Sequence, residues 1–568
     1  MKAPDAERGP AGETVRVALA RVSRTNVPKI IILYIINNVN SIFLNFTKIT
    51  VKSPAKAYIV QIAFGVTLSM NKNAHKIFIN TLMLTAASLV MRGVGLIFQV
   101  YLAGKIGPSA IGVYSLIMSV YTMFTTLGSG GIRFAVTRLT AEALAEGGCV
   151  RKTIRSSLGY SLFFGLFSGL CLFSGGGFIS ERWIGSAHCA AALRILALSL
   201  PFISLSAVFG GYFTGVERVM RSVSVNILEQ LSRIFTTIAL LSVLSGGIGQ
   251  ICTALAIAAT AGEIISFFAL SILYVIDIRR IPKVHKRDRY LPKLFGTAMP
   301  IAISSYMRTG LNSLGHILIP RGLQQSGANF NSAFAAYGTI HGMAFPMLLF
   351  PSALLTALAE LIIPRLTSAQ TEGSQRGINY MATRVIKIGL IFSVGVGGIM
   401  FFFGEPLGTA VYKNAEVGRY LRCFAPLVPV MYCDMITDGC LKGLGQHMKA
   451  MVINIAEATL NVILLYILIP RYAITGYGIS IYVCECFNFV LSFGRLLRVA
   501  DIDIGLFDLA RILLSAAAAA KLVTFVFSGL GLVASILLAV AAYLIILYMV
   551  RVIAKSDVTW FKSVVRQK

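Results

Sequence analysis

Long apolar stretches separated by short polar connections fill the chain from about residue 78 to residue 553. A transmembrane helix needs about 20 apolar residues to cross a hydrocarbon core roughly 30 Å thick. Fourteen stretches of this length can be counted, at residues 78–104, 108–130, 155–178, 193–214, 223–245, 249–275, 294–319, 331–360, 384–404, 419–440, 448–470, 475–497, 506–528 and 530–553. The pattern predicts an all-α polytopic membrane protein with fourteen transmembrane helices.

Lysine and arginine residues concentrate on alternate connections. If every stretch crosses the membrane, one side carries 30 of these cations from residue 70 onward, and the other side carries eight. Cytoplasmic connections of membrane proteins are normally the ones rich in Lys and Arg. The asymmetry therefore predicts a multi-pass protein with both termini in the cytoplasm.

A repeat at a constant offset of 228 residues relates the two halves of the chain. GYFTGVERVMRSVSVNILE at Gly211–Glu229 aligns without a gap with GCLKGLGQHMKAMVINIAE at Gly439–Glu457. Shorter similarities occur in stretches that correspond between the two halves: Arg138-Leu-Thr with Arg365-Leu-Thr, Met91-Arg92 with Met307-Arg308, and Glu263 with Glu485.

A repeat of six spans gives two halves of the same orientation, related by a pseudo-two-fold axis along the membrane normal. The repeat predicts an N-lobe at residues 70–285 and a C-lobe at 286–500. Residues 501–568 would form two extra helices and a cytoplasmic tail. Two facing bundles without an extramembrane domain are typical of transporters that work by alternating access.

Composition agrees with this class. Hydrophobic residues make up 56% and charged residues 13%, against about 25% charged residues in soluble domains. The net charge of +28 would suggest a nucleic-acid partner for a soluble protein. Here the cations follow the membrane topology, so no nucleic-acid partner is expected. The nine cysteines mostly lie in apolar stretches, which predicts packing roles and neither a metal site nor a disulfide framework.

Residues 1–69 differ from the rest of the chain. Their one apolar stretch is interrupted by Asn37, Asn38, Asn40 and Asn45, and each amide would need a partner in hydrocarbon. Met70 is followed by a short polar segment and then a long apolar helix. We hypothesise that translation begins at Met70 and that residues 1–69 reflect an over-extended reading frame. The alternative is a disordered or interfacial extension.

Two arginines stand in the middle of apolar stretches at equivalent places of the repeat. Arg92 lies midway along the first stretch and Arg308 midway along the seventh. A charged side chain at the bilayer centre costs roughly 2.5–3.5 kcal/mol on insertion scales, so its presence there indicates a function or a bonding partner. Two guanidiniums could converge on a central cavity and bind phosphate or carboxylate. Alternatively, each arginine pairs with a carboxylate of a neighbouring helix and only stabilises the helix bundle.

Acidic residues within the apolar stretches are candidates for binding a coupling cation or for gating. They are Asp434, Asp438, Glu263, Glu485 and Glu457. The aspartates could instead form a solvated face near a helix end, and the mid-span glutamates could be protonated and hydrogen-bonded. Glu229 and Arg233 are spaced to neutralise each other on one helix, which predicts a structural pair.

Motifs of catalysis are missing from the sequence. It contains no G-x-x-x-x-G-K-[ST] phosphate loop, no H-E-x-x-H and no G-x-S-x-G. We therefore expect no enzyme activity, no catalytic residues, no cofactor and no resident metal.

The segment NTLMLTAASLVMRGVGLIFQVYLAGKIGPSAIGVYSLIMSVYTMFTTLGSGGIRFAVTRLTAE, at Asn80–Glu142, resembles the start of a known family. This family is the polysaccharide-biosynthesis and stage V sporulation protein B branch of the multidrug/oligosaccharidyl-lipid/polysaccharide (MOP) exporter superfamily. The segments Gly107–Tyr114 and Gly131–Leu139 carry most of the resemblance, with Lys442–Gln446 in the second half.

The resemblance implies a flippase of the bacterial cytoplasmic membrane without ATPase activity. Its substrate would be an undecaprenyl-pyrophosphate-linked oligosaccharide, with lipid-linked peptidoglycan precursor as the leading candidate. In related flippases, arginines of a central cavity bind the pyrophosphate, and the last two spans form a groove for the lipid tail. Here the depth of Arg92 and Arg308 makes them the residues expected to bind it.

The sequence thus predicts a monomeric flippase whose partners are the lipid-linked oligosaccharide, the lipid bilayer and a coupling cation, H⁺ or Na⁺. One alternative is a cation-coupled multidrug exporter of the same superfamily, whose cavity should be acidic. A less favoured alternative is a membrane glycosyltransferase or ligase, which would need a catalytic carboxylate on a sizeable loop.

Overall fold

The computed structural model describes residues 72–146, 148–243, 246–280, 290–502, 505–526 and 531–552. The hypothesis about residues 1–69 and most of the predicted cytoplasmic tail lie outside these residues. The proposed lobe boundary at 285/286 also falls outside them.

Helices account for almost all of the described chain, as the apolar pattern predicts. In chain order they are α4 (Lys72–Ser129), α5 (Ile132–Ala145), α6 (Val150–Phe178), η1 (Ile179–Ile184), η2 (Ala187–Cys189), α7 (Ala190–Gly215), α8 (Val219–Val243), α9 (Ile248–Ile278), α10 (Tyr290–Gln325), α11 (Phe330–Tyr337), η3 (Gly338–Ala344), α12 (Phe345–Leu349), α13 (Ser352–Thr371), α14 (Gln375–Phe402), α15 (Gly404–Tyr412), α16 (Ala415–Phe424), η4 (Ala425–Leu427), α17 (Val428–Gly443), α18 (His447–Leu497), α19 (Leu506–Val526) and α20 (Leu532–Met549).

The two longest helices each contain a sharp break. In α4, Gly107 has φ 78° and precedes Pro108, and in α18, Ala473 has φ 48° three residues after Pro470. Proline lacks the backbone N–H that continues a helix, and glycine accepts a positive φ without steric cost. Both breaks lie between consecutive predicted spans, so each long helix corresponds to two of them.

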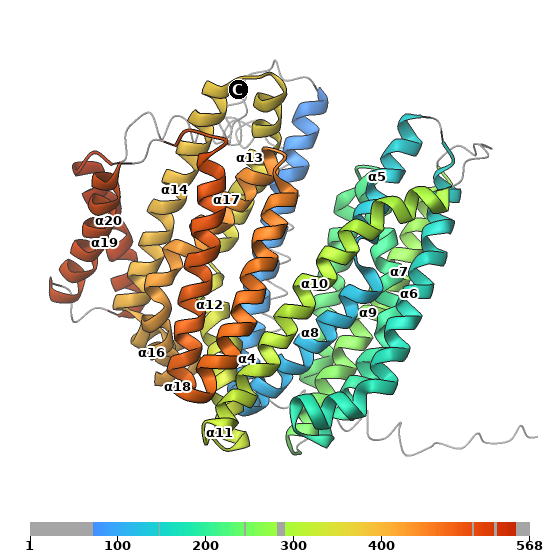
Figure 1. Ribbon diagram of the computed structural model, residues 1–568, viewed down its shortest axis with the longest axis horizontal. Coiled ribbons are helices and arrows are strands. Elements are labelled where there is room, and N and C mark those ends of the chain that lie inside the picture. The colour runs from blue at the N-terminus through green and yellow to red at the C-terminus, as the bar shows by residue number, and fades with distance from the viewer. Residues whose placement is uncertain are drawn as a thin grey trace, which may run out of the picture.

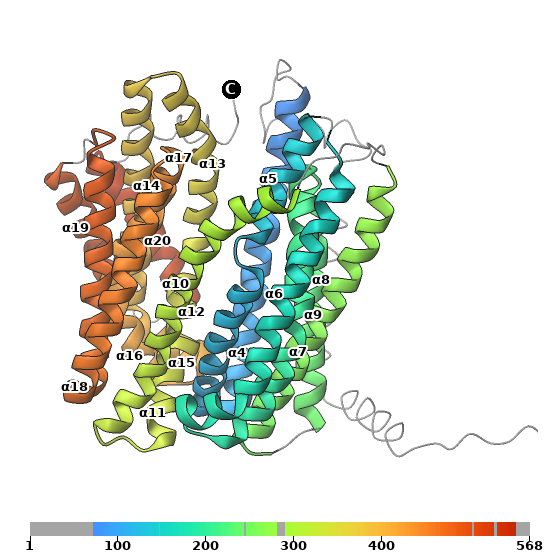
Figure 2. The same ribbon diagram turned by 45° about the vertical axis from the view of Figure 1, so that its right-hand side comes forward.

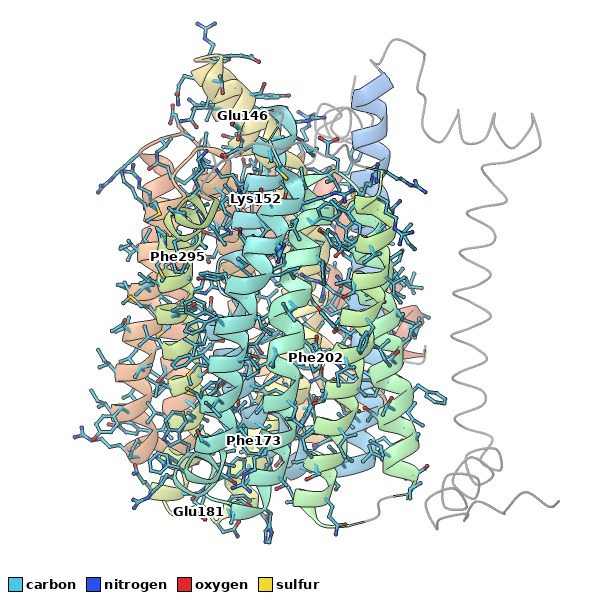
Figure 3. All side chains as sticks on the ribbon, turned by 90° about the vertical axis from the view of Figure 1, so that its right-hand side faces the viewer. Glu146, Lys152, Phe173, Glu181, Phe202 and Phe295 are labelled. Atoms are coloured by element: carbon cyan, nitrogen blue, oxygen red, sulfur yellow. The ribbon has the colours of Figure 1, made fainter. Side chains whose placement is uncertain are left out.

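The described residues contain eight helices that are long and apolar enough to cross a membrane. Two of these eight contain the broken helices. One is α18, and the other is α4 together with α5, which are counted as one continuous helical segment, Ala87–Ala145. Figure 3 shows the matching distribution of side chains: Glu146 and Lys152 lie toward one end of the bundle, Glu181 lies at the other, and Phe202 lies between them. The chain is a multi-pass membrane protein, and the total of fourteen spans stays a prediction.

The helices group by halves of the chain. Helices α5 to α9 pack on one another, and α13, α14, α17 and α18 form a second group. Helices α4 and α10 contact each other between the two groups, and α19 and α20 lie at the outer edge against α14 (Figures 1 and 2). We call the end that holds α5 and the α13–α14 connection the basic end, because exposed Arg138 and Arg376 lie there.

Small residues of the sequence repeat explain one contact in the first group. At Gly211 and Gly215, α7 packs so closely on α5 that an added Cβ would lie 2.7 Å from the Arg133 carbonyl oxygen and 2.8 Å from that of Thr137. The Thr137 hydroxyl donates a hydrogen bond to the Gly211 carbonyl oxygen at 3.2 Å. Membrane helices commonly approach through such pairs of small residues four positions apart.

The second copy of the repeat makes the corresponding contact in the other group. On α17, a Cβ at Gly439 would lie 2.8 Å from the Ala359 Cβ, and one at Gly443 would lie 3.1 Å from the Ile363 carbonyl oxygen. The Thr367 hydroxyl donates to the Gly443 carbonyl oxygen at 2.8 Å. The repeated glycines therefore set the approach of α7 to α5 and of α17 to α13.

Candidate functional site

A cavity of about 660 Å³ lies between the two groups of helices. Its walls come from α4 and α8 of the first half and from α10, α11 and η3 of the second. Most of its polar lining is neutral, with amides such as Gln99 and Asn312 and hydroxyls such as Ser115. This position, between halves that the sequence relates by a repeat, is the one expected for a transporter's binding site.

Arg308 and Arg233 are the two arginines in the described lining of the cavity. Arg308 comes from α10 and is exposed. Arg233 comes from α8, is partly buried, and forms salt bridges with Glu229 at 3.1 Å and with Glu263 at 3.2 Å. The Glu229–Arg233 pair predicted from helical spacing is present, and Glu263 adds a second carboxylate from α9.

The structure places the two predicted arginines differently. Arg308 lines the cavity, whereas Arg92 is exposed on α4 outside its lining. Arg92 precedes Gly95, the first lining residue of α4, by three positions, or about 4.5 Å along the helix. The sequence predicted Arg233 only as a member of a structural pair, although its position in the middle of a span indicated that it could line a cavity.

The four candidate carboxylates of the second half are linked electrostatically through Asp434. Asp438 forms a salt bridge with Lys442 at 2.6 Å. Asp434, Glu457 and Glu485 interact electrostatically with one another in the interior. Arg308 also acts electrostatically on Glu457, so this carboxylate belongs to the surroundings of the cavity arginine.

Asp434 is held by an amide network that joins three helix segments. Asn488 donates through its Nδ2 to the Asp434 carboxylate at 3.0 Å and contacts Asn454 Oδ1 at 3.3 Å. Asp434 Oδ1 is buried and has no hydrogen-bond partner among the described residues. No group of three or more His, Cys, Asp or Glu side chains suited to a metal occurs in the described part of the chain.

Histidine and tyrosine side chains line the second-half wall of the cavity. The His316 and His341 rings lie 4.7 Å apart between centroids. His316 Nδ1 is 3.0 Å from the Tyr337 hydroxyl, and His341 is hydrogen-bonded to the Tyr477 hydroxyl. Both histidines are thus hydrogen-bonded packing residues.

Direct contacts between α4 and the second half close one side of the cavity. Gln99 Nε2 donates to the Gly342 carbonyl oxygen at 2.7 Å, and the Ser313 hydroxyl donates to the Ser119 carbonyl oxygen at 2.9 Å. Gly112 and Gly338 bring the backbones still closer, since a Cβ at Gly112 would lie 2.0 Å from the Phe334 carbonyl oxygen. Gly112 follows the break in α4 and Gly338 follows α11, so this close approach lies at the α11 end, opposite the basic end (Figure 1).

Together these residues can bind a polar molecule that carries a negative charge. The exposed guanidinium of Arg308 supplies charge-assisted donors for an oxyanion, and the neutral amides and hydroxyls can bond uncharged polar groups.

Comparisons with protein families and curated proteins agree on one group of relatives. Residues 77–370 match the family described as polysaccharide biosynthesis protein, and residues 331–467 match MatE. The chain is similar to stage V sporulation protein B of Bacillus subtilis, with 23% identity over 416 residues, 71% of this chain and 80% of that protein. It is also similar to sporulation protein YkvU of the same organism, with 18% identity over 391 residues, 68% of this chain and 87% of that protein.

Solved structures share the fold. Lipid II flippase MurJ in an inward closed conformation superposes with a TM-score of 0.65 and 15% identity, covering 82% of this chain and 98% of that chain. An inward-facing multidrug resistance MATE family transporter of the MOP superfamily superposes with a TM-score of 0.56 and 14% identity, covering 78% and 98%. At these identities the likeness concerns the helical fold alone.

Proposed function

Because this chain belongs to the polysaccharide biosynthesis protein family within the MOP superfamily, we propose that it is a flippase for a lipid-linked oligosaccharide. The substrate would be an undecaprenyl-pyrophosphate-linked sugar of the bacterial cytoplasmic membrane, with peptidoglycan precursor as the leading candidate. The observation that carries the proposal is the cavity between the two halves, which combines an exposed arginine with a mostly neutral polar lining.

In this proposal the pyrophosphate binds Arg308. Arg233 already has two carboxylate partners, so Arg308 supplies the larger part of the attraction for an incoming anion. Arg92, three positions beyond the lining toward the start of α4, would meet the pyrophosphate as it enters. The sugar would contact the amides and hydroxyls, and the prenyl chain would stay in lipid.

Transport would proceed by alternating access of two six-helix lobes within a fourteen-span topology whose termini are cytoplasmic. The contacts of α4 with α10 and η3 would form the extracytoplasmic gate, closed here. Opening this gate and closing the basic end would release the sugar into the outer leaflet. A single chain contains the whole cavity, so a monomer suffices.

Coupling to H⁺ or Na⁺ would use the interior carboxylates. Asp434 is the leading residue, because one of its oxygens is buried without a partner among the described residues. Glu457 and Glu485 would share the ion or proton with Asp434. Glu263 would respond through its salt bridge with Arg233. Asp438 would act on the gate through its salt bridge with Lys442. Ion binding near Glu457 would change the field at Arg308 and so link the ion to the pyrophosphate.

Reconstitution tests the proposal directly. Vesicles containing the purified protein and labelled lipid-linked precursor are scored for exposure of the label on the outer leaflet. Loss of charge-assisted bonds worth about 1.5–3 kcal/mol should reduce transport by Arg308→Gln roughly tenfold or more. Arg376→Gln, a charge change on the surface of α14, is the matched control. Normal transport by Arg308→Gln would remove Arg308 from the binding site.

A cation-coupled multidrug exporter is the second candidate, since residues 331–467 match MatE. The carboxylates beside Arg233 could receive a cationic drug if that arginine moved. Transport of a cationic dye by the same vesicles, without transport of the lipid-linked precursor, would favour this candidate. The named relatives include a flippase and a transporter, so a glycosyltransferase or ligase activity is not proposed.

A further inference from the structure

We infer that Cys189 and Cys252 form a disulfide on the extracytoplasmic side of the membrane, where it cross-links the connection before α7 to the start of α9. The bond is a covalent modification within the first group of helices. This inference goes beyond the flippase proposal and rests on it only for the orientation, in which the basic end is cytoplasmic.

The two cysteines come from separate elements and meet in the core. Cys189 is the last residue of η2, and Cys252 lies near the beginning of α9. Their side chains are hydrogen-bonded to each other, and both are thiols in the structure. The exposed fraction is 0% for Cys189 and 1% for Cys252. Each thiol therefore has the other as a direct neighbour inside the packed bundle.

The backbones around the pair also approach closely. An added Cβ at Gly249 would lie 2.7 Å from the His188 Cβ and 3.2 Å from the His188 carbonyl oxygen. Gly249 and Cys252 are three positions apart, so they lie on the same face of α9. The Cys189 N–H donates to the Ser186 carbonyl oxygen at 3.2 Å, which orders the connection. A disulfide can join only segments whose backbones come close together, and η2 and α9 do so here.

The pair lies at the end of the bundle opposite the basic end. The last residue of α9, Ile278, accepts a hydrogen bond from Arg151 at 2.9 Å, beside Lys152 at the basic end (Figure 3). Helix α9 therefore begins at the opposite end, where Figure 3 also shows Glu181 of the connection that leads to η2. With the basic end in the cytoplasm, both cysteines lie on the oxidising side, where disulfides form and persist.

The bond would form by thiol–disulfide exchange with an external disulfide. Ala187 and His188 are exposed, so local opening of this short connection presents the Cys189 thiol at the surface. The Cys189 thiolate attacks the external disulfide and releases one thiol, and the Cys252 thiolate then attacks the mixed disulfide and releases the second. Two electrons pass to the external disulfide, and the two cysteine protons end on the released thiols.

The expected consequence is greater stability. The bond would close a segment of about 60 residues that contains α7 and α8, and such a cross-link restricts the unfolded chain. Both cysteines belong to the first group of helices, so the bond leaves the two groups free to move against each other.

Mass spectrometry of the full chain from bacterial membranes tests the inference. Cells are quenched in acid, the protein is alkylated under denaturing conditions, and it is digested without reductant. We expect a Cys189–Cys252 cross-linked peptide that disappears on reduction, whereas Cys433 and Cys440 of α17 should be recovered alkylated. Recovery of Cys189 and Cys252 as alkylated thiols would overturn the inference.

Thermal unfolding in detergent measures the same bond independently. Dithiothreitol should lower the Tm of the wild type by several degrees and leave that of Cys252→Ala unchanged. Cys423→Ala, which removes an exposed thiol on α16, is the matched control and should respond as the wild type does. No response in the wild type, or an equal response in Cys252→Ala, would contradict the assignment.

Labelling of intact cells separates the disulfide from the orientation. In a Cys189→Ala/Cys252→Ala background, His188→Cys places a thiol at an exposed position beside the pair. A membrane-impermeant maleimide should label this variant above the level of its background protein. Absence of added label would refute the orientation that the disulfide and the flippase topology share. Added label together with free Cys189 and Cys252 in the wild type would refute the disulfide alone.

Discussion

Individual charges in the membrane take their roles from their partners. Arg308 and Arg233 both line the central cavity, but only Arg233 has two carboxylates within 3.2 Å. The same residue type is thus expected to serve two purposes, with Arg308 available to an anionic substrate and Arg233 joining α8 to α9.

This difference predicts opposite phenotypes. Arg233→Met leaves Glu229 and Glu263 close together without their cation, and breaking such a partly buried network should cost roughly 3 kcal/mol. Thermal unfolding in detergent should show a clear fall in Tm for Arg233→Met and little change for Arg308→Gln. A Tm that falls equally in both variants would mean that Arg308 also has a structural role.

Pairs of helices are held by small residues that recur in the two halves. Gly211 and Gly439 occupy matching positions of the repeat, and each brings a helix within direct contact of its neighbour. In the membrane, such packing replaces the hydrophobic driving force available to soluble helices.

Adding a side chain at this contact should separate the helices. Gly211→Val would place a Cβ 2.7 Å from the Arg133 carbonyl oxygen, and overpacking of this kind costs about 1–3 kcal/mol. We expect a lower Tm and reduced yield of folded protein by size-exclusion chromatography. Gly159→Ala on α6, where an added Cβ meets nothing within 4 Å, should behave like the wild type.

At the scale of the whole molecule, α4 links the two halves. Gly112 meets the Phe334 carbonyl oxygen on one side, and a Cβ at Gly338 would lie 2.1 Å from the Pro108 carbonyl oxygen. No other residue type fits this approach without moving a backbone. The glycine pair therefore sets how tightly the side of the cavity toward α11 can close.

Gly338→Ala should shift the molecule away from the closed arrangement at this end. With spin labels at exposed Lys105 and Gln325, double electron–electron resonance should report longer distances in Gly338→Ala than in the wild type. Transport should slow, because one of the two alternating states becomes harder to reach. Unchanged distances would show that this contact is not part of the gate.

Much of the fold could be predicted from the sequence because the membrane imposes it. A segment in hydrocarbon must satisfy its own backbone hydrogen bonds, so apolar length alone predicts helices, and even the breaks near Gly107 and Ala473 fall between predicted spans. The repeat likewise identifies Gly211 and Gly439 as equivalent positions, and both lie at helix contacts. Membrane class, helical architecture and family followed from such local signals.

The site depended on tertiary structure, because helix rotation and neighbouring chains decide which side chains share a cavity. Equivalent positions in the repeat predicted the same role for Arg92 and Arg308, yet only Arg308 is in the described lining. A spacing of four residues identified the Glu229–Arg233 pair, but the third member, Glu263, comes from another helix. The sequence determined where each charged residue lies along its predicted span, whereas helix packing determined which partner it contacts.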